Sequence, residues 1–259
     1  MQESPAEVWA GRAGRFGLIC RGVVYLILAL LALQVARGRA TSEADQQGAL
    51  ADISRHPFGW LVVMAIAAGF VGLAFWQGWW ALRARQSEDH KRVVAFGKAL
   101  VYLALSVSAV SVALGRSKAS SDQRTTDITA RLMHHTLGQV LVGAVGVAFC
   151  AGGLILLWKA ARRAYDVEVK VDAVPDHVRR PFEVLGSIGM LGRGIVVALV
   201  GFFLVEAAVT FDPAHAKGLD AALRAVVRAP YGPWLLAGVA LALACFGCFS
   251  LLEARFAKT

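Results

Sequence analysis

The chain has 259 residues, of which 57% are hydrophobic and 17% are charged, with a formal net charge of +9 and a mean hydropathy of +0.57. This excess of apolar residues excludes an ordinary soluble domain and a disordered chain. The Lys and Arg residues are spread over short segments between apolar runs, so we expect no nucleic-acid partner. The positive charge is better explained by membrane topology and by attraction to anionic lipid headgroups.

Long apolar runs follow one another along the chain, and each is long enough to cross a hydrocarbon core of about 30 Å as a helix. The first run follows Arg12 and Arg15, as a signal peptide would, but no small-residue cleavage site ends it. We therefore expect it to be retained as a membrane helix. The predicted spanning helices cover about 15–36, 58–82, 93–115, 136–160, 184–209 and 230–253.

The six predicted helices form three copies of one two-helix unit. In each copy a cation lies 38 to 40 residues before a glycine that begins the second apolar run. The pairs are Arg21 with Gly59, Lys98 with Gly138, and Arg193 with Gly232. The copies cover 1–87, 88–165 and 181–259, and a charged segment, 166–180, is predicted to be a cytoplasmic linker. The predicted fold is an all-α polytopic membrane protein, with six transmembrane helices from three tandem repeats in a pseudo-threefold bundle.

Before each second spanning helix, two apolar residues lie four apart: Ala49 and Ile53, Ile128 and Leu132, and Ala222 and Val226. This spacing predicts a short amphipathic helix in each of the three outer loops. Lys and Arg are more numerous on the other side of the membrane, 14 against 10. By the positive-inside rule we expect both termini in the cytoplasm.

Several motifs carry a resemblance to a known family. They are the entry to the first helix (Gly14-Arg15-Phe16-Gly17 and Cys20-Arg21-Gly22-Val23-Val24-Tyr25), its end (Leu33-Gln34) and the turn Pro57-Phe58-Gly59. The third copy repeats them as Gly186, Gly189, Gly192-Arg193-Gly194 and Pro230-Tyr231-Gly232, whereas the middle copy has Lys98, Ala99 and Thr136 at the matching places. With these motifs the chain resembles the bacterial domain-of-unknown-function family 1206. The resemblance implies a six-helix bacterial membrane protein and transfers no activity.

The equivalent cations Arg21, Lys98 and Arg193 are the first candidate site. Each lies about 10 Å beyond the cytoplasmic start of its predicted helix. Under pseudo-threefold symmetry they would form a cytoplasm-facing ring suited to an anion, a phosphate headgroup or a partner's carboxylates. Alternatively, each cation reaches lipid phosphates or backbone carbonyls independently. Gly14 and Gly17 precede Arg21 along one helix face, as Gly186 and Gly189 precede Arg193, and this spacing predicts close helix packing.

A polar residue follows each cation by 13 positions: Gln34, Ser111 and Glu206. Glu206 could bind a cation or relay a proton, or it could meet water at the membrane interface. His56, His134 and His135 occupy matching loop positions without a recognised metal-ligand spacing, so we expect interfacial histidines and no metal. No nucleophile elbow, P-loop or paired-carboxylate pattern occurs, and we expect no catalytic residue and no cofactor.

These features favour a non-enzymatic accessory or scaffold subunit in the bacterial plasma membrane. Its expected partners are anionic lipid headgroups and another membrane protein complex. The alternative is a small transporter or channel for an anion or a lipid-like solute that uses the three cations. An enzyme ranks last, because the chain offers no candidate nucleophile or metal cluster.

Overall fold

The structure, a computed structural model, describes residues 5–39, 43–83, 89–115, 121–133, 136–162 and 176–256, and every regular element among them is helical. The elements are α1 (Pro5–Ala36), α2 (Gln46–Ser54), α3 (Gly59–Arg83), α4 (Asp89–Ala113), α5 (Ser121–Met133), α6 (Thr136–Ala161), α7 (Asp176–Thr210), the 3-10 helix η3 (Pro213–His215), α8 (Leu219–Val227) and α9 (Gly232–Phe256). In this part of the chain, α1, α3, α4, α6, α7 and α9 are long and apolar enough to cross a membrane. The all-α class with six spanning helices is therefore confirmed.

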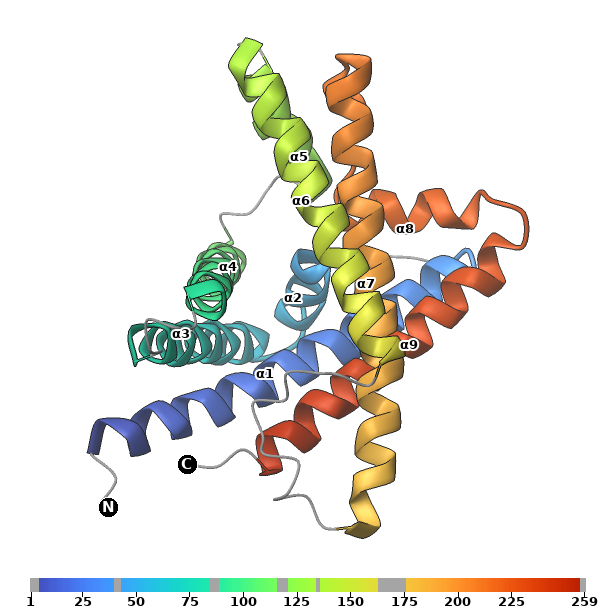
Figure 1. The fold of residues 1–259 in the computed structure, drawn as a ribbon. Coiled ribbons are helices and arrows are strands. Elements are labelled where there is room, and N and C mark those ends of the chain that lie inside the picture. The colour runs from blue at the N-terminus through green and yellow to red at the C-terminus, as the bar shows by residue number, and fades with distance from the viewer. Residues whose placement is uncertain are drawn as a thin grey trace.

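Each copy consists of a first spanning helix, a short helix and a second spanning helix: α1–α3, α4–α6 and α7–α9. The first spanning helices are longer than predicted, because α1 begins at Pro5 and α7 at Asp176. Most of the predicted linker, 166–180, lies outside the described residues, and its last five residues belong to α7. Both ends of the chain lie at the same end of the molecule in Figure 1.

The largest helix contacts join neighbouring copies rather than the helices of one copy. The second spanning helix of each copy packs along the first spanning helix of the next, as α3 on α4 and α6 on α7. The third such contact, α9 on α1, joins the last copy to the first (Figure 1). The three copies thus follow one another around a pseudo-threefold axis.

Small residues allow close approach at each of these contacts. Equivalent positions on the two facing helices carry Gly22 with Gly247, Gly153 with Gly194, and Ala74 with Ala99. A Cβ atom at Gly22 would lie 3.0 Å from the carbonyl oxygen of Gly247, and the reverse distance is also 3.0 Å. Because lipid supplies no hydrophobic drive for helix association, this close backbone contact is a main source of stability.

The middle copy departs from the pattern in its own internal contact. Within the first and third copies the spanning helices pack together, α1 on α3 and α7 on α9, whereas α4 and α6 make no substantial contact among their described residues. The glycine positions of α1 and α7, seven and four residues before the cation, carry Lys91 and Val94 in α4. The branched side chain of Val94 does not allow the close approach that glycine permits. The ring of helices is therefore open between α4 and α6 (Figure 1).

The short helices fold tightly against the second spanning helices. Phe58 and Tyr231 adopt positive φ values of 61° and 60°, which reverse the chain between short and spanning helix in the first and third copies. The residue that follows is always a glycine: Gly59, Gly138 or Gly232. A Cβ atom there would overlap a carbonyl oxygen at the end of the preceding short helix, such as that of Ile53 for Gly59. This overlap explains the glycine landmark of the repeat.

Aspartates join the three outer loops. Asp122 of α5 accepts a hydrogen bond of 2.9 Å from the backbone N–H of Ala221, in the first turn of α8. Asp220 of α8 accepts one of 2.7 Å from Ala44 of the first copy and one of 2.6 Å from Arg224. Gly218, the N-cap of α8, has no side chain to cap its own helix, so the second copy supplies the cap for the third.

We predict that Gly59→Ala destabilises the protein by about 1–3 kcal/mol, because the added methyl group must push α2 away from α3. Gly78→Ala in the same helix is the control: its Cβ meets nothing within 4 Å, and alanine favours a helix by about 1 kcal/mol over glycine. Thermal unfolding of the two variants in detergent measures the difference. Equal midpoints for both variants would contradict the close contact at Gly59.

The stability of the outer-loop contact at Asp122 should depend on pH. Burial first, and then the charges of Asp220 and Glu43, raise the pKa of Asp122 above its ordinary value of 3.8. Ionising Asp122 therefore costs the folded state stability, and this cost appears as the pH rises through the raised pKa. Asp122→Asn keeps an acceptor for Ala221, so its unfolding temperature relative to wild type should rise between about pH 4 and pH 7. Asp127→Asn, on the exposed side of α5, should show no such trend; a falling difference for Asp122→Asn would refute the prediction.

Candidate functional site

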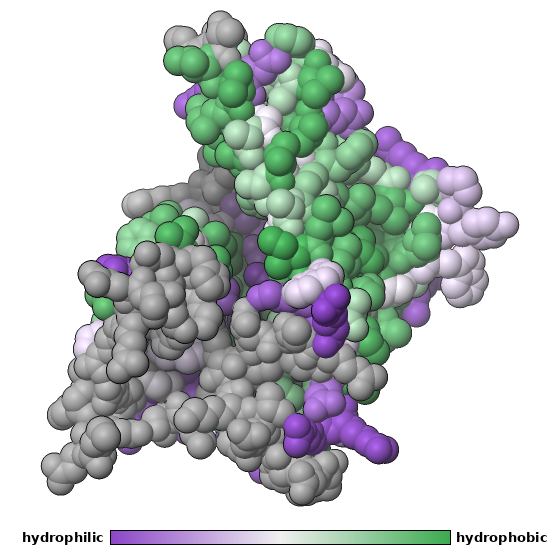
Figure 2. Space-filling view, in the orientation of Figure 1, coloured by the Kyte–Doolittle hydropathy of each residue, from purple (hydrophilic) through white to green (hydrophobic). Residues whose placement is uncertain are grey.

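The three cations of the repeat line one cavity. It has a volume of about 230 Å³ and lies among α1, α2, α3, α4, α7 and α9. Arg21 reaches it from α1, Lys98 from α4 and Arg193 from α7. The three cations that share a position in the sequence repeat therefore lie close together in the fold. Figure 2 shows hydrophilic side chains within the recess between the α4 side and the α7 side of the molecule.

Arg21 is buried, with 8% of its surface exposed, and its guanidinium is held by three side chains. It donates to the Ser250 hydroxyl at 3.1 Å, to the Tyr102 hydroxyl at 3.2 Å, and to the Glu253 carboxylate at 2.5 Å. Ser250 and Glu253 belong to α9, and both are buried. Arg21 lies about 15 Å along α1 from the start of its span at Gly11, where an unpaired charge would be costly. The three hydrogen bonds, one of them to a carboxylate, compensate for the cost of burying this charge.

Arg193 is held differently. Its guanidinium carbon lies 5.2 Å from the centroid of the Phe246 ring, and that of Arg21 lies 5.3 Å from the same centroid. Both distances suit cation–π attraction. Among the described residues Arg193 makes no hydrogen bond and no ion pair. Its donors are therefore available to a molecule in the cavity.

The cavity has a positive charge and an aromatic side. Its lining contains three cations and one carboxylate, Glu253, which gives a formal charge of +2. Tyr25 and Phe246 lie edge to face at 4.6 Å, and Tyr102 stacks on Phe70. In a low-dielectric surrounding, a cation-rich cavity of this kind attracts an anion strongly.

The other predicted polar residues lie apart from these cations. Gln34 lines a second pocket, described below, and the Ser111 hydroxyl donates to the carbonyl of Ser108 at 2.7 Å. Glu206 is half-buried near the end of α7, and among the described residues its carboxylate forms no ion pair. The structure therefore does not bring Gln34, Ser111 and Glu206 together with the cation cavity.

The four predicted packing glycines lie at helix contacts. A Cβ atom at Gly14 would lie 2.9 Å from the Trp76 ring, and one at Gly17 would lie 2.5 Å from the carbonyl oxygen of Gly69, both in α3. A Cβ atom at Gly186 would meet Phe249 at 2.9 Å, and one at Gly189 would meet the backbone of Phe246 at 2.6 Å, both in α9. These glycines set the distance between the spanning helices of the first and third copies.

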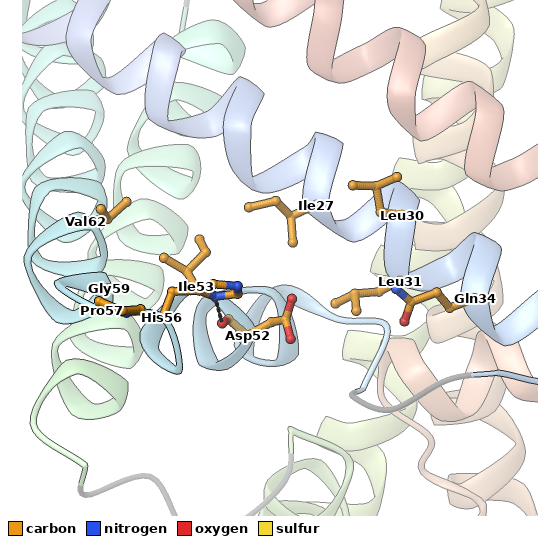
Figure 3. A pocket seen from close by; sticks show the side chains of 10 residues that line it. All are labelled: Ile27, Leu30, Leu31, Gln34, Asp52, Ile53, His56, Pro57, Gly59 and Val62. Atoms are coloured by element: carbon orange, nitrogen blue, oxygen red, sulfur yellow. Dashed lines mark hydrogen bonds between the residues drawn. The ribbon is translucent and has the colours of Figure 1, made fainter.

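The histidines show no metal centre within the described ranges, where no group of three His, Cys, Asp or Glu side chains comes together. His134 and His135 lie outside those ranges. His56 instead lines the second pocket, of about 280 Å³, between α1, α2 and α3. Figure 3 shows His56 beside Asp52 at one end of this pocket, with Gln34 at the other and apolar side chains between them.

Sequence reasoning missed the partners of Arg21. Glu253 lies near the end of its apolar run, where a carboxylate is typical of the membrane surface, and Tyr102 follows Lys98 by four residues as Tyr25 follows Arg21, which shows only the repeat. A usable signal was present: Ser250 and Glu253 lie three apart, on one face of an otherwise apolar helix. Polar residues at that spacing indicate a polar partner on a neighbouring helix.

We predict that Glu253→Ala destabilises the protein by about 3–5 kcal/mol, because it leaves the Arg21 charge buried without its counter-ion. Glu183→Ala, which removes the half-buried partner of the exposed Arg179, should cost about 1 kcal/mol or less. Replacing Arg21 and Glu253 together by Met and Leu should recover much of the loss. Thermal unfolding of the three variants tests this, and a Glu253→Ala midpoint equal to that of Glu183→Ala would refute it.

Comparison with known proteins agrees with the repeat. The family profile described as Domain of Unknown Function (DUF1206) matches residues 16–84, 93–163 and 188–257, one region in each copy. The chain is also similar to the Uncharacterized protein YxxB of Bacillus subtilis (strain 168), with 27% identity over 251 residues that cover 95% of this chain and 90% of the relative. No solved structure matches. The family resemblance is confirmed: the chain belongs to the family described as Domain of Unknown Function (DUF1206), and it contains three matches to the family profile in tandem.

Proposed function

We propose that this chain is a non-enzymatic protein of the bacterial plasma membrane, with both termini in the cytoplasm, that binds an anionic lipid headgroup in its cation-lined cavity. In this function it serves as an accessory or scaffold subunit beside a larger membrane complex. The similarity to a Bacillus subtilis protein supports the bacterial assignment. The excess of Lys and Arg in the loops on the side of the termini supports their orientation.

One observation carries the proposal: Arg193 faces the cavity with its hydrogen-bond donors unused by any described residue. Arg21 is committed to Glu253, and its role is to hold α1 on α9. Arg193 is therefore the main ligand-binding group, and Lys98 adds positive charge from α4. A guanidinium matches the oxygens of a phosphate group in both shape and charge.

The opening between α4 and α6 favours a lipid over a freely diffusing ion. Lys98 and Val101 of α4 line one side of the cavity, and Met190 and Arg193 of α7 line the opposite side. Because α6 does not close against α4, the headgroup of a lipid could enter laterally while its acyl chains stay in the bilayer. The many exposed apolar side chains of α4 and α6 suit contact with those chains.

A transporter for an anion or lipid-like solute is the second candidate, and one observation favours it. Gln46, at the start of the outer helix α2, lines the same cavity as Lys98. The cavity thus extends from the cation positions toward the opposite end of the bundle. A path through it would still require movement of the helices, because Phe246 and Phe249 lie in its lining.

We predict that Arg193→Gln weakens retention of phosphatidylglycerol about tenfold, because a charged hydrogen-bond partner of the phosphate is lost. Native mass spectrometry of the purified full chain, titrated with this lipid, measures the effect. Arg228→Gln is the matched control, since Arg228 is exposed at the end of α8 and away from the cavity. Equal retention by both variants would overturn the proposal.

Two further readouts separate the candidate functions. In proteoliposomes, a flux of inorganic phosphate or chloride that Arg193→Gln abolishes would favour the transporter. Gentle extraction from the native membrane, followed by mass spectrometry of the purified material, should instead show a stoichiometric protein partner if the chain is an accessory subunit. A lone protein that carries neither a partner nor an anionic lipid would count against the proposed function.

A further inference from the structure

The second pocket, at the opposite end of the bundle from the chain termini, has chemistry of the opposite kind. It lies between α1, α2 and α3 of the first copy, and no Lys or Arg lines it. Its polar groups are Gln34, Asp52 and His56 (Figure 3). Its other side chains are apolar. None of its lining residues lines the cation cavity, so the two pockets are separate sites.

Each polar group offers the pocket a hydrogen-bond acceptor. The buried amide oxygen of Gln34 has no hydrogen-bond partner. The Asp52 carboxylate forms no ion pair within the part of the chain that the structure describes. His56 donates through Nδ1 to the backbone oxygen of Asp52 at 3.1 Å, so a neutral ring leaves Nε2 as an acceptor. Figure 3 shows the Asp52 carboxylate between His56 and Gln34.

A single negative charge among acceptors sets the class of ligand. A phosphate or carboxylate would be repelled by Asp52 and would find no cation in the lining. A primary ammonium group suits this pocket, because its positive charge is attracted by the carboxylate and its three N–H groups can donate to the acceptors. The Nε2 of His56, beside Asp52 at the same end of the pocket, offers it a further acceptor.

The apolar wall indicates that this ammonium group belongs to a lipid. Ile27 and Leu30 of α1 and Val62 of α3 line the pocket above the polar groups in Figure 3, and Leu31 lies between Asp52 and Gln34. Leu30 is 59% exposed on a spanning helix, so the wall continues onto the membrane-facing surface.

We propose that this pocket binds the headgroup of a lipid with a primary ammonium group, as in phosphatidylethanolamine, with an acyl chain along Ile27, Leu30 and Val62. Asp52 and His56, which lie together at one end of the pocket, would receive the ammonium protons. The site is specific to the first copy among the described residues. At the positions equivalent to Gln34, the Ser111 hydroxyl is already bonded to a backbone oxygen, and Glu206 lines neither described pocket.

The test compares two lipids on the purified full chain by native mass spectrometry. Phosphatidylethanolamine should be retained about tenfold better than phosphatidylcholine, whose methylated headgroup keeps the charge but lacks N–H donors. Asp52→Asn should remove most of that preference. Asp127→Asn, an exposed carboxylate of α5 at the same end of the bundle, is the matched control and should leave it unchanged. The preference should also persist in Arg193→Gln, whose effect is on phosphatidylglycerol alone.

Two results would overturn this site: equal retention of phosphatidylethanolamine and phosphatidylcholine by the wild-type chain, or an unchanged preference in Asp52→Asn. Thermal unfolding shows whether Asp52→Asn is folded. If it is not, Leu30→Trp decides, because the larger side chain fills the apolar wall without touching the charge. Loss of phosphatidylethanolamine retention in Leu30→Trp supports the site, and unchanged retention refutes it.

Discussion

Close backbone contact between helices is the constraint on which this fold depends. In a membrane the hydrophobic effect does not press helices together, so association relies on packing and on polar contacts. In two of the three contacts between copies, the backbones of the facing helices come close together. Glycines meet at these points: Gly22 with Gly247, and Gly153 with Gly194. The same principle explains the exception. Where α4 carries Val94 in place of a glycine, it makes no substantial contact with α6 among the described residues, and the ring of helices opens.

The three equivalent cations have diverged in what surrounds them. Arg21 has a carboxylate, a serine and a tyrosine, which make it a structural residue of the α1–α9 contact. Arg193 has the face of an aromatic ring, which stabilises a cation while leaving its hydrogen-bond donors unused. One buried, satisfied charge thus holds the bundle together, and a second charge of the same repeat position is left for a ligand. Duplication of a unit allows this division of roles.

Much of the fold could be predicted from the sequence, because periodic landmarks report it directly. Apolar run length predicted the six spanning helices, and the spacing from each cation to its glycine predicted the three copies. The contacts between copies could not be predicted, since a repeat indicates which segments are equivalent but not which of them touch. Glu253 was overlooked for this reason: its partner lies 232 residues away, and only the α9–α1 contact brings it to Arg21. The absence of an α4–α6 contact could not be predicted either. Lys91 occupies the position equivalent to Gly14, and this difference has a meaning only when the packing role of Gly14 is known.

The contact between α9 and α1 has a consequence for biosynthesis. The chain is synthesised from its N-terminus, so α1 enters the membrane before α9, and Arg21 gains Ser250 and Glu253 as partners only when α9 has been made. During that interval a guanidinium lies within a spanning helix without its counter-ion, a state that costs free energy in a bilayer. A chain terminated before α9 never leaves this state. The charge of Arg21 in α1 therefore stays without its counter-ion until α9 packs against it.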